Sequence, residues 1–173
     1  MGMAITLKAY FAKQNIHYDT IKHRATMTAL DSSRAAHVSA GKVAKAVVLQ
    51  SNEGDYLMAS LPANSRLSLI DVNDFTGKQY QLVSEQQLQG LFPDCDRGAI
   101  PAMGVPYHME MLVDDSLLAT DAIYIESGDH ENFIKLNNKE YCHLMNSMPH
   151  AEIRGANLGS PRMWERTGRH WEI

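Results

Sequence analysis

A β-hairpin is the feature of this sequence that most restricts its fold. Residues 45–50, KAVVLQ, are apolar and rich in β-branched side chains, and residues 52–55, NEGD, have the composition of a turn. Residues 56–61, YLMASL, follow as a second apolar run. Two such runs around a turn predict antiparallel strands and argue against a sheet built only of parallel strands.

Further elements are predicted on both sides of this hairpin. Apolar spacing predicts an amphipathic helix over 4–14, and Thr28 followed by Asp31 has the pattern of a helix start. The other expected helices are 28–38, 69–75, 84–92 and 137–148, and the other expected strands are 16–21, 80–83, 108–115, 121–127 and 132–136. Strands outnumber crossover helices, so the sequence predicts an α+β fold with a curved, mixed, largely antiparallel sheet and helices on its outside.

Composition narrows the class of protein. The 173 residues fit one domain, and a hydrophobic content of 45% fits a globular fold. A net charge of -4 does not indicate nucleic-acid binding, although it leaves room for a local basic patch. Cys95 and Cys142 form no CxxC pair, and the histidines have no metal-ligand spacing, so no metal and no cofactor are expected. Two free thiols and the lack of a signal peptide or membrane span predict a cytoplasmic protein.

The last 25 residues differ in composition from the rest. Residues 149–173 are rich in Arg, Gly and Trp, which predicts a domain over 1–148 followed by a C-terminal extension. Trp164 and Trp171, together with the arginines, could stack on bases and bind phosphates, or the segment could be a packing strap. Four arginines lie in this segment, namely Arg154, Arg162, Arg166 and Arg169.

Two features could carry chemistry. Lys45 leads the most apolar strand and is either a solvated strand end or a cation directed at a phosphate or carbonyl oxygen in a cleft. Residues 94–104, DCDRGAIPAMG, are too long for a simple turn. There Gly98 allows close backbone approach and Pro101 stiffens the chain, so the run is either a connector or a loop whose N–H groups stabilise an oxyanion.

The order and spacing of these stretches resemble one family. The stretches are AKAVVLQ, GDYLMASLPA, DCDRGAIPAMG, LVDDSL and AIYIESGDHENFIKL, all within residues 20–148. Together they resemble the YbaK/ProX domain, which is also the editing insertion of bacterial prolyl-tRNA synthetases. The resemblance implies a curved, barrel-like sheet ringed by helices. It also implies that the protein hydrolyses the ester of mischarged tRNA in trans, with tRNA and an aminoacyl-tRNA synthetase as partners. Whether the protein is a monomer or a homodimer stays open.

The resemblance assigns roles to particular residues. Lys45 takes the place of the family's important lysine, and Gly98 with Ala99 lies in the loop that offers backbone donors. The loop reads Gly98-Ala99-Ile100-Pro101, so its proline comes one position earlier than in the family's GxxxP spelling. This departure leaves open the size of the pocket and therefore which amino acid the pocket accepts.

The resemblance also implies which residues form the walls of the amino-acid pocket. Gly128 matches a later family glycine, and Val47, Met58 and Ile100 are expected to sieve the amino-acid side chain. An alternative on the same fold is a module that binds aminoacyl-tRNA or an amino acid without hydrolysing it.

Overall fold

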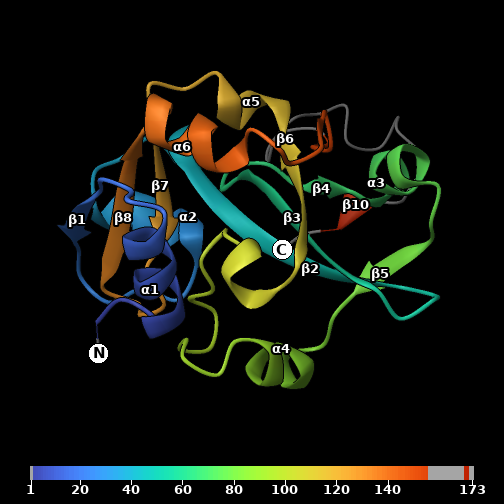
Figure 1. Cartoon of the computed structure of the whole chain (residues 1–173), viewed down its shortest axis with the longest axis horizontal. Helices are drawn as coiled ribbons and strands as arrows, with labels where there is room; N and C mark the ends of the chain where they lie inside the picture. The colour runs from blue at the N-terminus through green and yellow to red at the C-terminus, as the bar shows by residue number, and fades with distance from the viewer. Residues whose placement is uncertain (1, 156–169, 172–173) are drawn as a thin grey trace.

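A computed structural model describes residues 2–155 and 170–171 of the chain (Figure 1). Within them, helices alternate with strands as expected of an α+β fold. The helices are α1 (Ile5–Lys13), α2 (Ala29–Ala35), α3 (Leu69–Thr76), α4 (Glu85–Leu91), α5 (Asp115–Leu118) and α6 (Asn138–Met145), with 3-10 turns η1 (Ala40–Lys42) and η2 (Val105–Tyr107). The strands are β1 (Asp19–Lys22), β2 (Val43–Ser51), β3 (Tyr56–Pro62), β4 (Leu67–Ser68), β5 (Tyr80–Leu82), β6 (Glu110–Asp114), β7 (Ala122–Glu126), β8 (Asn132–Asn137), β9 (His150–Ala151) and β10 (His170–Trp171).

Eight strands form one mixed sheet in the described part of the chain. Their order is β1-β8-β7-β2-β3-β6-β9, with β5 also paired to β2. Four of its pairings are antiparallel, and three, β2 with β7, β3 with β6 and β6 with β9, are parallel. The predicted mixed sheet is therefore confirmed, but it is open: β1 and β9 end the order and do not pair with each other.

The long strand β2 connects the two halves of the sheet. Figure 1 shows it running from the group of β1, β8 and β7 toward β3 and β5. The predicted hairpin is present, since β2 pairs with β3 from Ala44 to Gln50. The other edge of β2 is shared: β7 pairs with Val43 and Ala44, whereas β5 pairs with Leu49–Ser51. Within the described chain, residues 45–47 therefore have a strand neighbour on one side only.

Local capping explains where the helices begin. The side chains of Thr28, Ser68, Ser84 and Asn137 each accept a hydrogen bond from a backbone N–H in the first turn of the following helix. At α4 the Gln87 side chain completes a capping box. Every helix expected from the sequence is thus found, whereas α5 and the short strands β4, β9 and β10 were not predicted.

The start of the predicted extension packs on the sheet. Strand β9 adds to β6, and the side chain of Ile153 is fully buried. The N–H of Ile153 donates to Asp114 Oδ2 at 3.0 Å, and its carbonyl oxygen accepts from the N–H of Ser68 at 2.7 Å. Arg162, Trp164, Arg166 and Arg169 lie outside the described residues, and the division at residue 148 stays a prediction. Among the residues that the structure describes, no helix is long and apolar enough to cross a bilayer.

Candidate functional site

Lys45 lies inside the protein and is not a solvated strand end. Its side chain is only 7% exposed, although it sits near the start of β2. Burial, and then the positive charge of Arg66, lower the pKa of Lys45 to about 8. A buried lysine with a lowered pKa is typical of a binding or catalytic site.

Lys45 also lies at a boundary between two apolar clusters. Val43 packs in the cluster beneath α2, whereas Val47, on the same face of β2, belongs to the cluster beneath α3. Lys45 stands between them, where β2 lacks a strand on one edge. The cation is thus placed at an interruption of both the sheet and its hydrophobic core.

A carboxylate that the sequence analysis missed follows the part of β7 that pairs with the start of β2. Val43 and Ala44 pair in parallel with Tyr124 and Ile125, so the next residues along the two strands are Lys45 and Glu126. The pairing of the two strands ends at Ala44 and Ile125, and alternation turns the side chains of both Lys45 and Glu126 to the face covered by α2. A charged residue ending an apolar strand was the signal that could have identified Glu126, since the same signal identified Lys45.

Hydrogen bonds from α2 fix Glu126 in place. The Ser32 hydroxyl donates to Glu126 Oε1 at 2.8 Å, and Thr26 Oγ1 lies 2.6 Å from Ser32 Oγ. Burial and the nearby negative charge of Asp129 raise the pKa of Glu126 to about 7, against the opposing effect of the Ser32 hydrogen bond. The group is therefore poised to gain or lose charge near neutral pH.

The glycine-proline loop is held against the turn that follows β7. The N–H of Asp96 donates to the carbonyl oxygen of Gly128 at 2.8 Å, and His130 Nε2 lies 2.6 Å from the carbonyl oxygen of Arg97. Gly98 has a φ of 83°, and a Cβ atom there would lie 3.4 Å from the carbonyl oxygen of Met27, just before α2. The loop thus contacts both segments that surround Glu126, which favours a site wall over a simple connector.

The backbone donors of this loop are partly occupied. The N–H of Ala99 closes a turn by donating to the carbonyl oxygen of Asp96 at 3.0 Å. Among the described residues, the N–H groups of Gly98 and Ile100 make no hydrogen bond. Gly98 is exposed, so its N–H remains the better placed of the predicted oxyanion donors.

The loop begins at a polar anchor on α1. Asp94 accepts hydrogen bonds from the N–H of Thr6 at 2.8 Å and from the hydroxyl of Tyr107 at 3.1 Å. Cys95 lies 3.4 Å from the same hydroxyl, and burial raises the pKa of its thiol to about 12. Such a thiol stays protonated at neutral pH, so Cys95 is a poor nucleophile.

The structure does not bring the three expected sieve residues together. Val48 pairs with Met58 and Val47 pairs with Ala59, so Val47 and Met58 point to opposite faces of the hairpin. Ile100 packs with the cluster that contains Met58. Pro101 is buried beside it. The side chain of Met58 is fully buried, so lining roles for these residues stay predictions.

Gly128 supports the packing of α1. A Cβ atom at this position would lie 2.7 Å from the Cβ of Ala4, closer than side chains approach one another. The N–H of Ala4 also donates to the carbonyl oxygen of Ser127 at 2.7 Å. The structure therefore gives Gly128 a scaffolding part, and contact with a substrate stays a prediction.

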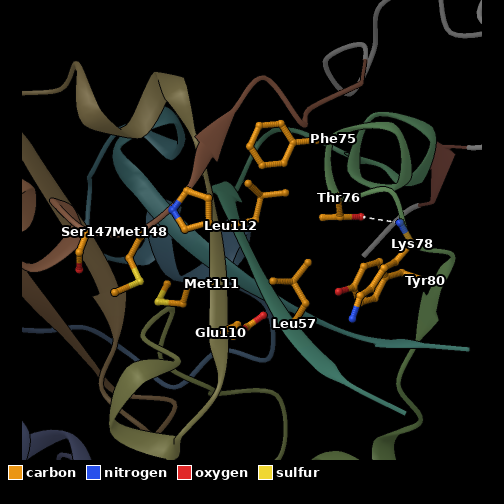
Figure 2. A pocket seen from close by; sticks show the side chains of 11 residues that line it. Leu57, Phe75, Thr76, Lys78, Tyr80, Glu110, Met111, Leu112, Ser147 and Met148 are labelled. Carbon is orange, nitrogen blue, oxygen red and sulfur yellow. Dashed lines mark hydrogen bonds between the residues drawn. The ribbon is translucent and has the colours of Figure 1, made fainter. Parts of the chain in front are cut away.

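A separate pocket of about 430 Å³ opens between α3 and the strands β3 and β6 (Figure 2). Leu57, Phe75 and Leu112 supply apolar walls, and Figure 2 shows Lys78 and Tyr80 across from the β6 side chains. The Lys78 ammonium group is already paired with carboxylates of the β2–β3 turn, Glu53 and Asp55. Neither Lys45 nor Glu126 lines this pocket.

The family model described as the aminoacyl-tRNA editing domain matches residues 23–144, more than half of the chain. This range contains Lys45, Gly98 and Glu126, and it confirms the resemblance drawn from the sequence. No curated protein matches the sequence at a significant level.

Solved structures share the fold at low sequence identity. A hypothetical protein, APE2540, has a TM-score of 0.77 and 16% identity, covering 87% of this chain and 99% of that chain. A protein described as a candidate trans-editing enzyme for prolyl-tRNA synthetase has a TM-score of 0.76 and 17% identity, covering 88% and 97%. A candidate signal transduction protein from Marinobacter aquaeolei VT8 has a TM-score of 0.69 and 14% identity, covering 88% of this chain but 31% of that one.

Proposed function

Because the chain belongs to the aminoacyl-tRNA editing domain family, we propose that it is a deacylase that acts in trans on mischarged tRNA. The bond broken is the ester between the carbonyl carbon of the amino acid and a hydroxyl oxygen of the terminal ribose. Water adds to that carbon, the ribose oxygen leaves and takes up a proton, and a free amino acid and tRNA result.

This reaction needs orientation and charge stabilisation more than a protein nucleophile. An aminoacyl ester is already activated, and the adjacent ribose hydroxyl can help to position the water. The Lys45 ammonium group would hold the carbonyl oxygen or the terminal phosphate, and the N–H of Gly98 would donate to the developing oxyanion. The thiol of Cys95 takes no part, because its pKa is about 12.

The observation that carries the proposal is the placement of Lys45. Lys45 is 7% exposed and lies at a break in strand pairing on β2, and a buried ammonium group is unusual because its burial costs stability. The family match over residues 23–144 supports a role for it in editing.

A deacylation panel tests the proposal. Each mischarged tRNA is incubated with the wild-type protein and with the Lys45→Ala variant, and the released amino acid is measured. Lys42→Ala is the matched control, since Lys42 is a more exposed lysine paired with Asp121. We expect release from at least one tRNA, a loss of about a hundredfold or more in Lys45→Ala, and no loss in Lys42→Ala. Absence of release from every tRNA would refute the proposal.

A binding module without turnover is the second candidate. The observation favouring it is the Ala99 N–H, which donates to Asp96 and so leaves fewer donors for an oxyanion. This candidate predicts saturable binding of aminoacyl-tRNA with no release of amino acid above the uncatalysed rate. The panel separates the two candidates when binding is measured on the same samples.

A further inference from the structure

Glu126 is a buried acid whose surroundings disfavour its charged form. Its side chain is 4% exposed, and Oε2 makes no hydrogen bond to any described residue. The charged group that acts on it is Asp129, another carboxylate. Asp129 accepts hydrogen bonds from the N–H groups of Glu131 and Asn132, which hold it in its anionic form. An ionised Glu126 is therefore disfavoured unless a cation comes to it.

A structural role for Glu126 explains one of its two carboxylate oxygens but not the other. Oε1 accepts the Ser32 hydrogen bond and so helps to hold α2 on the sheet. A glutamine could accept the same bond through its amide oxygen without burying a charge. Within the part of the chain that the structure describes, the second oxygen makes no hydrogen bond that would explain a carboxylate here.

The position of Glu126 matches the chemistry of an aminoacyl ester. In this substrate the α-ammonium group is attached to the carbon next to the ester carbonyl. Lys45 and Glu126 follow directly on the paired residues Ala44 and Ile125, so the two side chains leave adjacent strands on the same face. A carbonyl oxygen near Lys45 would bring the ammonium group of the same substrate toward Glu126.

We propose that Glu126 Oε2 binds the α-ammonium group of the aminoacyl moiety, so that the site accepts esters with a free amino group and rejects N-acylated ones. The proposal rests on the proposed function, because it assigns a substrate group to the same site. It makes Glu126 a specificity-determining residue, and it excludes peptidyl and formylated esters from the substrates.

Binding of two analogues tests this without any turnover. The probes are 3′-amino-3′-deoxyadenosine carrying alanine through an amide bond, and the same compound acetylated on the alanine nitrogen. Alanine is chosen because its side chain is a single methyl group, and the amide bond is chosen because it resists hydrolysis. Dissociation constants are measured by calorimetry at pH 7, where the free amino group is largely protonated, for the wild-type protein and for Glu126→Gln.

We expect the wild-type protein to bind the free-amino probe about tenfold or more tightly than the acetylated one, as a charge-assisted hydrogen bond requires. Glu126→Gln should bind the two within about twofold of each other. Any of three results would overturn the proposal. The wild-type protein could bind both probes equally, Glu126→Gln could keep the preference for the free-amino probe, or neither probe could bind.

Two further variants separate a lost charge from a damaged fold. Ser32→Ala removes the bond to Oε1 but leaves the carboxylate, so it should keep the preference for the free amino group. If Glu126→Gln does not fold, Glu126→Ser, which places a small hydroxyl there, should show the same loss of preference. A preference for the free amino group in a protein that never releases amino acid would support this inference while refuting the deacylase.

Discussion

The site around Lys45 and Glu126 and the pocket of Figure 2 differ in what they offer a ligand. The pocket has a volume of about 430 Å³ and apolar walls, but its lysine, Lys78, is neutralised by Glu53 and Asp55. The site on β2 shows little exposed surface, yet it buries a cation beside Arg66 and an acid beside Asp129. The comparison teaches that charge buried at a cost is a better guide to function here than open volume.

Activity measurements give the largest expected contrast between the two regions. Lys45→Met removes the charge and keeps most of the side-chain length, so deacylation should fall about a hundredfold or more. Phe75→Ala, which removes a side chain that is 51% exposed in the pocket, should leave the rate within about twofold. Initial rates on the best substrate of the panel check both. An equal loss in Phe75→Ala would mean that the substrate uses the pocket of Figure 2.

The pH dependence of stability should separate the carboxylates of the two regions. The pKa of Glu126 is raised to about 7 from an ordinary value of 4.5. The stability that it contributes is therefore fully present below pH 4.5 and is lost as pH rises to 7, a loss of about 3 kcal/mol in the free energy of unfolding. Glu126→Gln should remove this loss.

Urea unfolding between pH 4.5 and 8 measures this effect. The control is Glu110→Gln, because Glu110 is an exposed carboxylate that lines the pocket of Figure 2. Its curve should run parallel to that of the wild-type protein. A Glu126→Gln curve that is also parallel would show that Glu126 is not held in a costly environment.

Two glycines with similar backbone angles test the loop next to the site. Gly98 and Gly54 have φ angles of 83° and 95°, so alanine at either position should cost about 1 kcal/mol of stability. A Cβ atom at Gly98 would be in ordinary contact with Met27 and His130 beside the candidate site, whereas at Gly54 it would meet no atom within 4 Å. Only Gly98→Ala should therefore slow deacylation, by about tenfold. Similar rates in both variants would place the loop outside the site.

The smallest effect is expected at the ion pairs beside the pocket. Lys78→Ala breaks contacts with Glu53 and Asp55 that lie in solvent. Exposed ion pairs contribute little, so the melting temperature should change by less than about 2 °C and deacylation should not change. A larger drop would mean that the turn between β2 and β3 depends on this lysine.

The parts of the fold that depend on neighbouring residues were predicted well from the sequence. The hairpin of β2 and β3 and the helices begun by Thr28, Ser84 and Asn137 were all expected, because each signal lies within a few residues of the structure it specifies. Strands β4, β9 and β10 were missed, because two-residue strands carry no periodic pattern.

The candidate site was predicted in part. The pattern alone left Lys45 either a solvated strand end or a cation in a cleft, and the resemblance to the editing family assigned its role. Gly98 was identified by the irregular loop around it and by the same resemblance. Glu126 was missed, and Val47 was grouped with Met58 although the two point to opposite faces. The register of the predicted hairpin, together with alternation along its two strands, would have separated Val47 from Met58. The placement of Glu126 and Lys45 on one face of adjacent strands follows from the parallel pairing of β2 with β7.

The sequence by itself determined the helix starts, the hairpin and the family, because capping, turns and motif spacing act over short stretches of chain. Only the tertiary structure decided that Lys45 is buried and that Glu126 lies on the same face of the adjacent strand. The physical reason is that both facts depend on contacts between distant strands, whose partners are selected when the whole core packs and not by any local preference.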